Sequence, residues 1–255
     1  MSEDRVIDIG GLIEPEDDYD GPVLVVFAID PGVATGWSAW KVPVALLAEA
    51  TVARTVARCR HRYGTILRSH VTTPTGAGAS WSRTDSTHVN HIFDMAGRIY
   101  EEWMPTWTDC ERCDGTGRPR FGQHPEAIGD VCEACEGEGG EWDVDNPDDY
   151  RFVFVMESFT LRRPEMDPDL LAPVRVASVF MDRLAQREAP PRTFFQGPSD
   201  AKNTVTDDRL KRMGVYDRSS GLHARDADRH AILLIRRFVE GVDLRKRIFG
   251  YDPLG

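Results

Sequence analysis

The chain has 255 residues, 41% of them apolar, so it can bury a core of ordinary size without disulfide bonds. Its formal net charge is -11, and no apolar run approaches the roughly 18 to 20 residues that a membrane span requires. Its first twenty residues are acidic and unlike a signal peptide. From these features we expect neither a membrane-spanning nor an exported protein, but a soluble protein of the cytoplasm.

The negative charge is concentrated in two segments of the chain. Residues 1–20 hold eight acids and one base, and residues 104–150 hold thirteen acids and three bases, which leaves a net charge of +6 for the rest. Residues 151–255 alone contain nineteen bases and fifteen acids. A basic face that binds phosphates is therefore compatible with the acidic total, although the same bases are equally expected on ordinary solvated helices.

The first predicted elements are a tail and two strands. Residues 1–21 combine many acids with few apolar side chains, which predicts a flexible acidic tail. The run VLVVFAID over residues 23–30 is apolar and rich in β-branched side chains, which predicts a central buried strand that ends at Asp30. A tight turn rich in Pro and Gly follows, and residues 37–41 are predicted to return as an antiparallel strand.

The next segment is less regular. Residues 44–62 mix Ala and Leu with Val and Thr, and we predict a helix there. A third strand is predicted over residues 63–71, and the glycines of residues 76–80 indicate a loop. Apolar residues at helical spacing predict a helix over residues 85–104, which the following proline ends.

The second half of the chain alternates strands with helices. Residues 151–156 (RFVFVM) predict a compact strand that ends at Glu157. After it we expect a helix, a short strand and two further helices, over residues 170–187, 193–196, 206–213 and 224–239 respectively. This order indicates an α/β domain with a mixed sheet.

Three acids are predicted at the ends of buried elements, namely Asp30, Glu157 and Asp226. Carboxylates packed together repel one another and lose hydration, a cost that Mg²⁺ or Mn²⁺ would remove. Two such ions can activate a water molecule and stabilise the leaving oxygen of a phosphodiester. The alternative is that each acid separately caps its own strand or helix.

The last predicted helix carries further polar side chains. Residues three or four apart share a helix face, so His223, Asp226 and His230 are predicted to point the same way. His223 then becomes a candidate proton carrier or metal ligand. Asp228 points nearly opposite and is predicted to lie at the surface.

Three segments together resemble the RuvC family of Holliday-junction resolvases. Residues 29–37 (IDPGVATGW) are similar to the family's opening D-P-G-x-x-x-G motif, whose aspartate is a metal ligand. Residues 156–158 (MES) resemble the glutamate at the end of the fourth strand, and residues 223–227 (HARDA) resemble the closing H-x-x-D-A element of the last helix. Other residues look especially like those of phage-encoded members: Lys202, 206–207, 209–210 and 229–231.

The resemblance implies a fold, a reaction and a partner. The fold would be ribonuclease H-like, a mixed sheet flanked by helices, formed by residues 22–103 and 151–255. The reaction would be metal-dependent cleavage of Holliday junctions or other branched DNA, in the cytoplasm of a host cell if the chain is phage-encoded. A homodimer is implied, because a four-way junction presents two equivalent strands and a two-fold dimer places one site at each.

The resemblance also implies roles for single residues. The catalytic set would be Asp30, Glu157, His223 and Asp226, of which the three acids would bind Mg²⁺ or Mn²⁺. The basic surplus of the main domain provides candidate contacts to DNA, namely Lys202, Lys211 and Arg212.

Four of the five cysteines form two copies of C-x-x-C-x-G-x-G within a predicted inserted module over residues 104–150, with 18 residues between Cys113 and Cys132. Four thiolates make a closed tetrahedral site, so we expect one structural Zn²⁺ bound by Cys110, Cys113, Cys132 and Cys135, with unliganded thiols as the alternative. The pattern is similar to the zinc-binding repeats of the DnaJ chaperone family, from which we infer only the metal. The acidic surroundings favour a role in protein contact or dimer geometry. Cys59 stands alone and is expected to be a small buried residue.

Two other functions compete with nuclease activity. Sugar kinases and actin-like ATPases also begin with an aspartate and glycine turn, but they need a second domain with another phosphate loop, and this sequence shows none. The other alternative is a non-catalytic, zinc-containing DNA-binding or adaptor protein on a ribonuclease H-like scaffold. Retention of the full catalytic set argues against that alternative.

Overall fold

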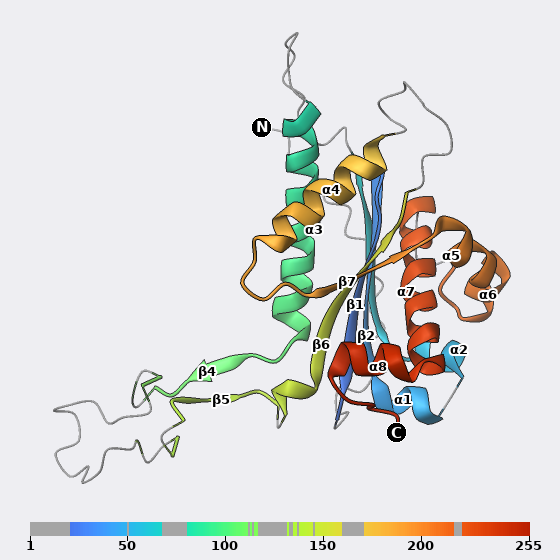
Figure 1. Ribbon diagram of the computed structural model, residues 1–255. Coiled ribbons are helices and arrows are strands. Elements are labelled where there is room, and N and C mark those ends of the chain that lie inside the picture. The colour runs from blue at the N-terminus through green and yellow to red at the C-terminus, as the bar shows by residue number, and fades with distance from the viewer. Residues whose placement is uncertain are drawn as a thin grey trace.

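A mixed five-stranded sheet forms the centre of the protein (Figure 1). The computed structural model describes residues 21–49, 51–67, 81–111, 113, 115–116, 132, 135–136, 138–144, 146–159, 171–216 and 221–255. The strand order is β3-β2-β1-β6-β7. The strands are β1 (Val23–Asp30), β2 (Ala34–Pro43), β3 (Arg60–Leu67), β6 (Tyr150–Glu157) and β7 (Arg192–Gln196).

The strand directions bring three carboxyl ends together. β2 is antiparallel to both β1 and β3, whereas β6 is parallel to β1 and β7 is parallel to β6. The last residues of β1, β6 and β7 therefore meet at one edge of the sheet.

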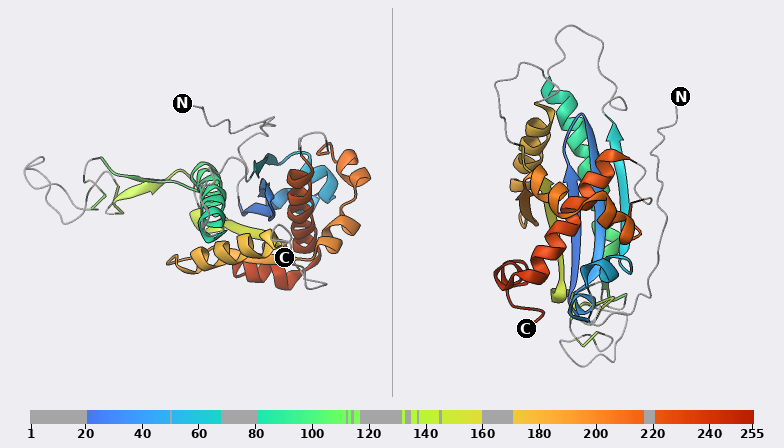
Figure 2. Two further views of the ribbon diagram at one scale, coloured as in Figure 1. Left: turned by 90° about the horizontal axis from the view of Figure 1, so that it is seen from above. Right: turned by 90° about the vertical axis from the view of Figure 1, so that its right-hand side faces the viewer.

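Helices cover both faces of the sheet (Figures 1 and 2). One face packs against α3 (Trp81–Trp103) and α4 (Ala172–Ala185). The long helix α7 (Leu222–Glu240) crosses the other face. Shorter helices surround it: α1 (Val44–Glu49), α2 (Val52–Val56), α5 (Pro198–Thr204), α6 (Asp207–Arg212) and α8 (Val242–Phe249).

Strand β1 supplies both halves of the core. Its even-numbered apolar residues from Leu24 to Ala28 pack toward α7, and its odd-numbered residues from Val23 to Ile29 pack toward α3 and α4. Successive side chains of a strand point to opposite faces, so a strand covered on both faces must be apolar throughout. The predictions of a central buried strand and of a mixed sheet flanked by helices are confirmed.

The prediction of a helix over residues 44–62 is wrong in its second half. The helices α1 and α2 occupy residues 44–49 and 52–56, and strand β3 begins at Arg60. Buried His61 and Tyr63 alternate with more exposed arginines, a period of two that polar residues conceal from a hydrophobicity pattern. Strand β2 is longer than predicted, and the short helices α5 and α8 were not predicted.

Several predictions concern residues outside the described ranges. The acidic tail lies there except for its last residue, and so does the predicted loop over residues 76–80. None of the described helices is long and apolar enough to cross a membrane.

A second, smaller sheet stands away from the five-stranded one (Figures 1 and 2). Its two antiparallel strands are β4 (Trp107–Asp109) and β5 (Gly140–Trp142), which follow α3 and precede β6 in the chain. The rings of Trp107 and Trp142 pack edge to face with centroids 5.4 Å apart. We call this small sheet and the segment between its strands (residues 107–142) the arm. The short 3-10 helix η2 (Pro147–Asp149) leads from the arm back into β6.

Candidate functional site

The predicted acids gather at the carboxyl edge of the sheet. Ile29 of β1 pairs with Met156 of β6, so Asp30 and Glu157, each one residue further on, end neighbouring parallel strands. Asp226 approaches from the second turn of α7. Asp30 and Asp226 are buried, and the Glu157 side chain is 17% exposed.

Gly36 allows α7 to reach this edge. It pairs with Asp30 across β1 and β2, and the first turn of α7 lies directly against it. A Cβ atom at Gly36 would lie 2.0 Å from the carbonyl oxygen of His223 and 2.6 Å from the backbone nitrogen of Ala224. No side chain fits there, so the second glycine of the motif is needed for the contact between helix and sheet that brings His223 and Asp226 to Asp30.

Asp30 and His223 form a close pair. The Nδ1 atom of His223 lies 3.0 Å from the Oδ2 atom of Asp30. Burial is the main cause that raises the pKa of Asp30; the hydrogen bond with His223 opposes it, and the charges of Glu157 and Asp226 raise that pKa further. The hydrogen bond to Asp30 raises the pKa of His223 above its usual value, although partial burial opposes it. The pair therefore lies hydrogen-bonded at the edge of the acid cluster, and the pKa values of both members are raised.

His230 contacts the carboxylate of Glu157 from a buried position on α7. Its Nε2 atom lies 3.0 Å from Oε2 of Glu157, and its Nδ1 atom lies 3.1 Å from Oε1 of Gln196, at the end of β7. The His230 side chain is only 1% exposed, so it orients the carboxylate and cannot itself reach a large substrate. The sequence placed His230 on the face of His223 and Asp226, but its contact with Glu157 was not predicted.

Two cations contact Asp226. The Nζ atom of Lys202, on α5, lies 3.1 Å from Oδ2 of Asp226, and Arg229 binds Oδ1. Arg229 also binds Asp207 and donates from Nε to the carbonyl oxygen of Val205 at 3.1 Å, which ties α7 to the segment joining α5 and α6. Burial lowers the pKa of Lys202, but the hydrogen bond and charge of Asp226 and the charges of the other two acids outweigh it and raise that pKa overall.

A cavity of about 470 Å³ opens beside this cluster. It is lined by Lys202, Thr206, Asp207, Asp208, Leu222, Asp226 and Arg229. The cavity therefore joins one acid of the cluster to the ammonium of Lys202, and it lies between α7 and the α5 to α6 segment.

Two solved structures are similar to this chain, whereas comparisons with protein families and curated proteins found no match. No protein-family model matches the chain, and no curated protein does either. RuvC from Thermus thermophilus in complex with a Holliday junction substrate is similar over 86% of this chain and 96% of its own, with 13% identity and a TM-score of 0.44. A second Thermus thermophilus RuvC structure is similar over 88% of this chain and 95% of its own, with 13% identity and a TM-score of 0.41.

The acid cluster has the donor chemistry of a divalent metal site. Its carboxylate oxygens are the hard ligands that Mg²⁺ and Mn²⁺ prefer. Burial, and after it the charges of Glu157 and Asp226, raise the pKa of Asp30, and a cation would offset both effects. In the structure each acid has its own nitrogen partner, from His223, His230, Lys202 or Arg229. The three acids do not form a group of ligand atoms within 4.8 Å of one another, so their side chains would have to approach to share an ion.

The other two predicted DNA contacts lie outside the cavity. Lys211 and Arg212 are exposed on α6. The Nζ atom of Lys211 lies 4.9 Å from the centre of the Tyr216 ring, and the guanidinium carbon of Arg225 lies 4.5 Å from the same ring. Arg225, next to Asp226 in the chain, is thus a further basic residue of this region that was not among the predicted DNA contacts.

The prediction that Asp228 lies at the surface is wrong. It is fully buried, and its Oδ1 atom accepts from Oγ of Ser38 at 2.6 Å and lies 2.7 Å from Nε2 of His61. Residues 226–235 are buried on every side, because the sheet covers one side of α7 and the α5 to α6 segment covers the other. A helix buried all round has no solvent face, so opposite positions on it are both internal.

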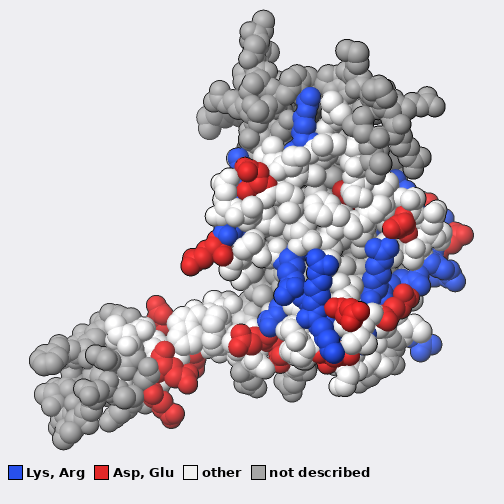
Figure 3. Space-filling view, viewed as in Figure 1, with Lys and Arg blue, Asp and Glu red and all other residues white. Residues whose placement is uncertain are grey.

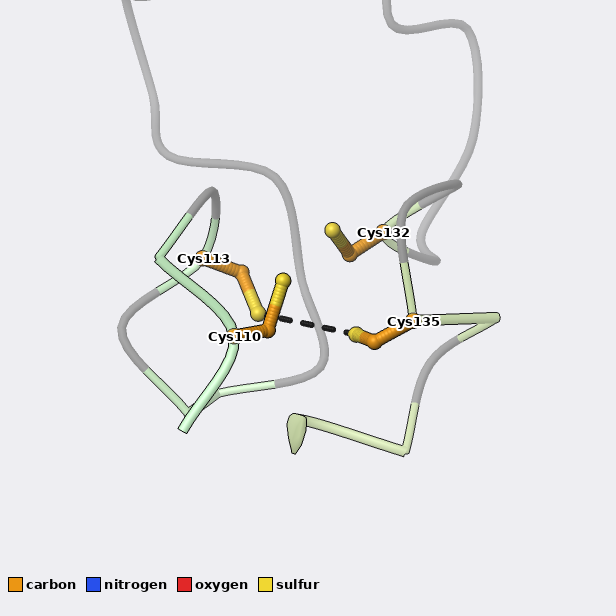
Figure 4. A group of neighbouring side chains, drawn as sticks. All are labelled: Cys110, Cys113, Cys132 and Cys135. Carbon is orange, nitrogen blue, oxygen red and sulfur yellow. Dashed lines mark hydrogen bonds between the residues drawn. The ribbon is translucent and has the colours of Figure 1, made fainter. Parts of the chain in front are cut away.

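The four cysteines of the arm converge as predicted (Figure 4). Their sulfur atoms all lie within 4.8 Å of one another, and the side chains point toward a common centre. The backbone N–H of Gly139 donates to Sγ of Cys135 at 3.2 Å from a turn in which this glycine has a φ of 90°. The cluster can hold a metal ion. Cys59 is fully buried elsewhere, as expected, and burial raises the pKa of its thiol to about 12, so it is not a nucleophile.

Proposed function

We propose that this protein is a metal-dependent endodeoxyribonuclease that cuts Holliday junctions or other branched DNA. The observation that carries the proposal is the convergence of Asp30, Glu157 and Asp226 from two strands and a helix, beside a cavity that also holds Lys202. Separate capping roles would not require the acids to lie so close that the charges of Glu157 and Asp226 help to raise the pKa of Asp30. A shared cation explains why they lie together.

Each residue then has a distinct task. Asp30 and Glu157 hold metal from adjacent strand ends, with Glu157 oriented by His230, and Asp226 completes the set from α7. Two Mg²⁺ or Mn²⁺ ions, when bound, would activate a water molecule and stabilise the leaving oxygen. The His223 side chain is 43% exposed and hydrogen-bonded to Asp30, which suits it to accept or deliver a proton at the scissile phosphate.

Lys202 is suited to bind the phosphate that is cut. Its side chain is 53% exposed and lines the cavity, and the three acids favour its charged form. Lys211 and Arg212 on α6 extend positive charge away from the cavity, where they would contact neighbouring phosphates. The motif resemblance supports a branched substrate and a two-fold homodimer with one acid site for each strand.

We further propose that residues 22–103 and 151–255 form the nuclease domain and that residues 104–150 form an inserted zinc module. Thiolates bind zinc at about 2.3 Å in a tetrahedron, and the four gathered cysteines suit that geometry. The module would act in protein contact or dimer geometry. Thiolates remain available for zinc in the reducing cytoplasm, where we place the protein.

The decisive experiment is a cleavage assay on four-way junction, flap and linear duplex DNA, with Mg²⁺, with Mn²⁺ and with EDTA. The protein should cut the junction or the flap faster than the duplex, and only with metal. Asp30→Asn should reduce the rate by at least about a thousandfold while leaving folding and DNA binding intact, because it removes one ligand charge without changing shape. A fully active Asp30→Asn protein would overturn the assignment of the site.

The same assay separates the alternative functions. Binding of DNA without cleavage in either metal would favour the non-catalytic DNA-binding or adaptor protein. Equal cleavage of all three substrates, or a strict monomer on junction DNA by sedimentation, would leave a general nuclease in place of a resolvase.

A further inference from the structure

A second basic surface lies at the opposite end of the sheet from the acid cluster. Lys and Arg side chains gather over β7 and α8 in Figure 3, in the lower part of the front face. We define the α8 patch as Arg151 at the start of β6, Arg192 at the start of β7 and Arg247 on α8. None of these residues has a role in the proposed catalysis.

The three arginines share one face of the sheet. Arg192 pairs with Val153, and Val153 packs into the core on the α7 side, so Arg192 and Arg151, two residues before Val153, lie on that side as well. The guanidinium carbon of Arg247 lies 5.1 Å from the centre of the Phe194 ring on β7. The patch is therefore built by the strand register and by one helix packed against it.

Aromatic rings and backbone carbonyls contact two of these guanidinium groups, namely those of Arg151 and Arg247. Arg151 lies 5.7 Å from the Phe249 ring centre and donates to the carbonyl oxygens of Tyr150 and Phe249. Within the described residues, no carboxylate forms an ion pair with any arginine of the patch.

Neighbouring arginines, in contrast, form ion pairs with acids. Arg236, Arg237 and Arg245 are paired with Glu240, Asp200 and Asp252 respectively. The α8 patch thus keeps its positive charge for a partner.

We infer that the α8 patch binds the phosphate backbone of a duplex arm that leaves the acid cluster, an inference that rests on the proposed nuclease function. Strand β7 connects the two sites, since Gln196 at its end contacts His230 and Arg192 lies at its start. Along β7 the patch lies four residues from the carboxyl end of the strand, and along β6 it lies six residues from it. In extended chain these separations are about 13 to 20 Å. At about 3.4 Å per base pair, this reach corresponds to about four to six base pairs from the scissile phosphate.

The chemistry of the patch favours phosphate over a protein partner. Guanidinium groups match phosphate oxygens in two-point hydrogen bonds, and stacking on rings reduces the entropy lost when they bind. The competing occupant is the acidic segment of a second protein copy, residues 104–150, which carries a surplus of ten negative charges. Sedimentation of the patch variant distinguishes this occupant from DNA.

The test compares arm lengths. Four-way junctions with GC-rich, hairpin-closed arms of about 3 or about 15 base pairs, which end before or extend beyond the patch, are bound without Mg²⁺ over a range of salt concentrations. Wild-type protein should bind the long-armed junction about tenfold more tightly. Arg192→Gln/Arg247→Gln should lose that gain, its salt dependence should fall by about two released ions, and cleavage of short-armed junctions with Mg²⁺ should be unchanged.

The matched control is Arg54→Gln/Arg58→Gln, which removes the same charge from exposed positions on α2 and just before β3, the edge strand opposite β7. It should keep the gain with arm length. The inference would be overturned if the patch variant gained as much affinity from the longer arms as wild-type protein does, or if both variants lost that gain equally. Junction cleavage would still support the proposed nuclease in either case. A patch variant that becomes monomeric in sedimentation, with an unchanged gain per arm, would show that the patch binds a second copy instead. Absence of any junction binding or cleavage by wild-type protein would instead refute the proposed function itself.

Discussion

Replacing Gly36 by alanine should displace the first turn of α7 and thereby disable the acid cluster. The added Cβ atom would lie 2.0 Å from the carbonyl oxygen of His223, and ordinary contact begins near 3.4 Å, so the helix or the strand must move by about 1.4 Å. The obstacle is backbone on both sides, in a sheet and a helix that are buried. Side-chain rotation cannot relieve it.

The magnitude follows from that displacement. Overpacking of a tight interior costs about 1 to 3 kcal/mol, and the rigid backbone places Gly36→Ala near the upper value. A misplacement of about 1 Å in a catalytic group lowers rates by about a hundredfold. Because His223 and Asp226 both move with α7, we expect the cleavage rate to fall by at least that factor in molecules that remain folded.

Urea unfolding followed by circular dichroism measures the first effect, and junction cleavage under conditions where the variant stays folded measures the second. Gly97→Ala is the matched control, because a Cβ atom at Gly97 in α3 meets nothing within 4 Å and alanine favours a helix by about 1 kcal/mol. Gly97→Ala should be as stable as wild type or more stable, with normal activity. A Gly36→Ala protein with wild-type stability and rate would refute the close contact between α7 and β2.

Two further predictions concern buried side chains outside the catalytic set. In a thiol-labelling assay on native protein, a zinc chelator should release four reactive thiols from the cysteine cluster. Cys59 should react only after unfolding, because burial raises the pKa of its thiol to about 12. Labelling of Cys59 before unfolding would contradict its burial. Asp228→Asn should lower the free energy of unfolding by about 1 to 3 kcal/mol, since it weakens the contacts with Ser38 and His61, whereas Asp243→Asn on the exposed side of α8 should change it by less than about 0.5 kcal/mol. Equal stabilities of these two variants in urea would show that the Asp228 contacts add nothing.

Local signals in the sequence predicted the elements that are regular and apolar. The unbroken apolar run of β1 indicated a strand buried on both faces, because only such a strand needs apolar residues at every position. The repeated C-x-x-C spacing predicted four gathered thiols, because each pair is held together by its own short turn. The strand-ending positions of Asp30 and Glu157 were also readable, since parallel strands end at a common edge.

Local signals misled where a segment's neighbours determine its conformation or burial. Strand β3 carries His61 on a core position, and this histidine is tolerated because Asp228 of α7 and the ring of Trp40 surround it. Asp228 in turn was assigned to the surface because a helix was expected to have one solvent face. Both errors have one cause, which is that polar groups can be buried when they hydrogen-bond one another across elements, as Nε2 of His61 and Oδ1 of Asp228 do.

The tertiary structure alone decided how the candidate site is assembled. The sequence placed Asp30, Glu157 and Asp226 on separate elements, and their approach depends on the parallel pairing of β1 with β6 and on the space left at Gly36. The partners of the acids come from still other elements, with Lys202 on α5 and Gln196 at the end of β7. Residue type and spacing report what a segment can do by itself. Contacts between segments far apart in the chain arise only when the whole core packs, because the burial of apolar surface that drives them is a property of the assembled layers.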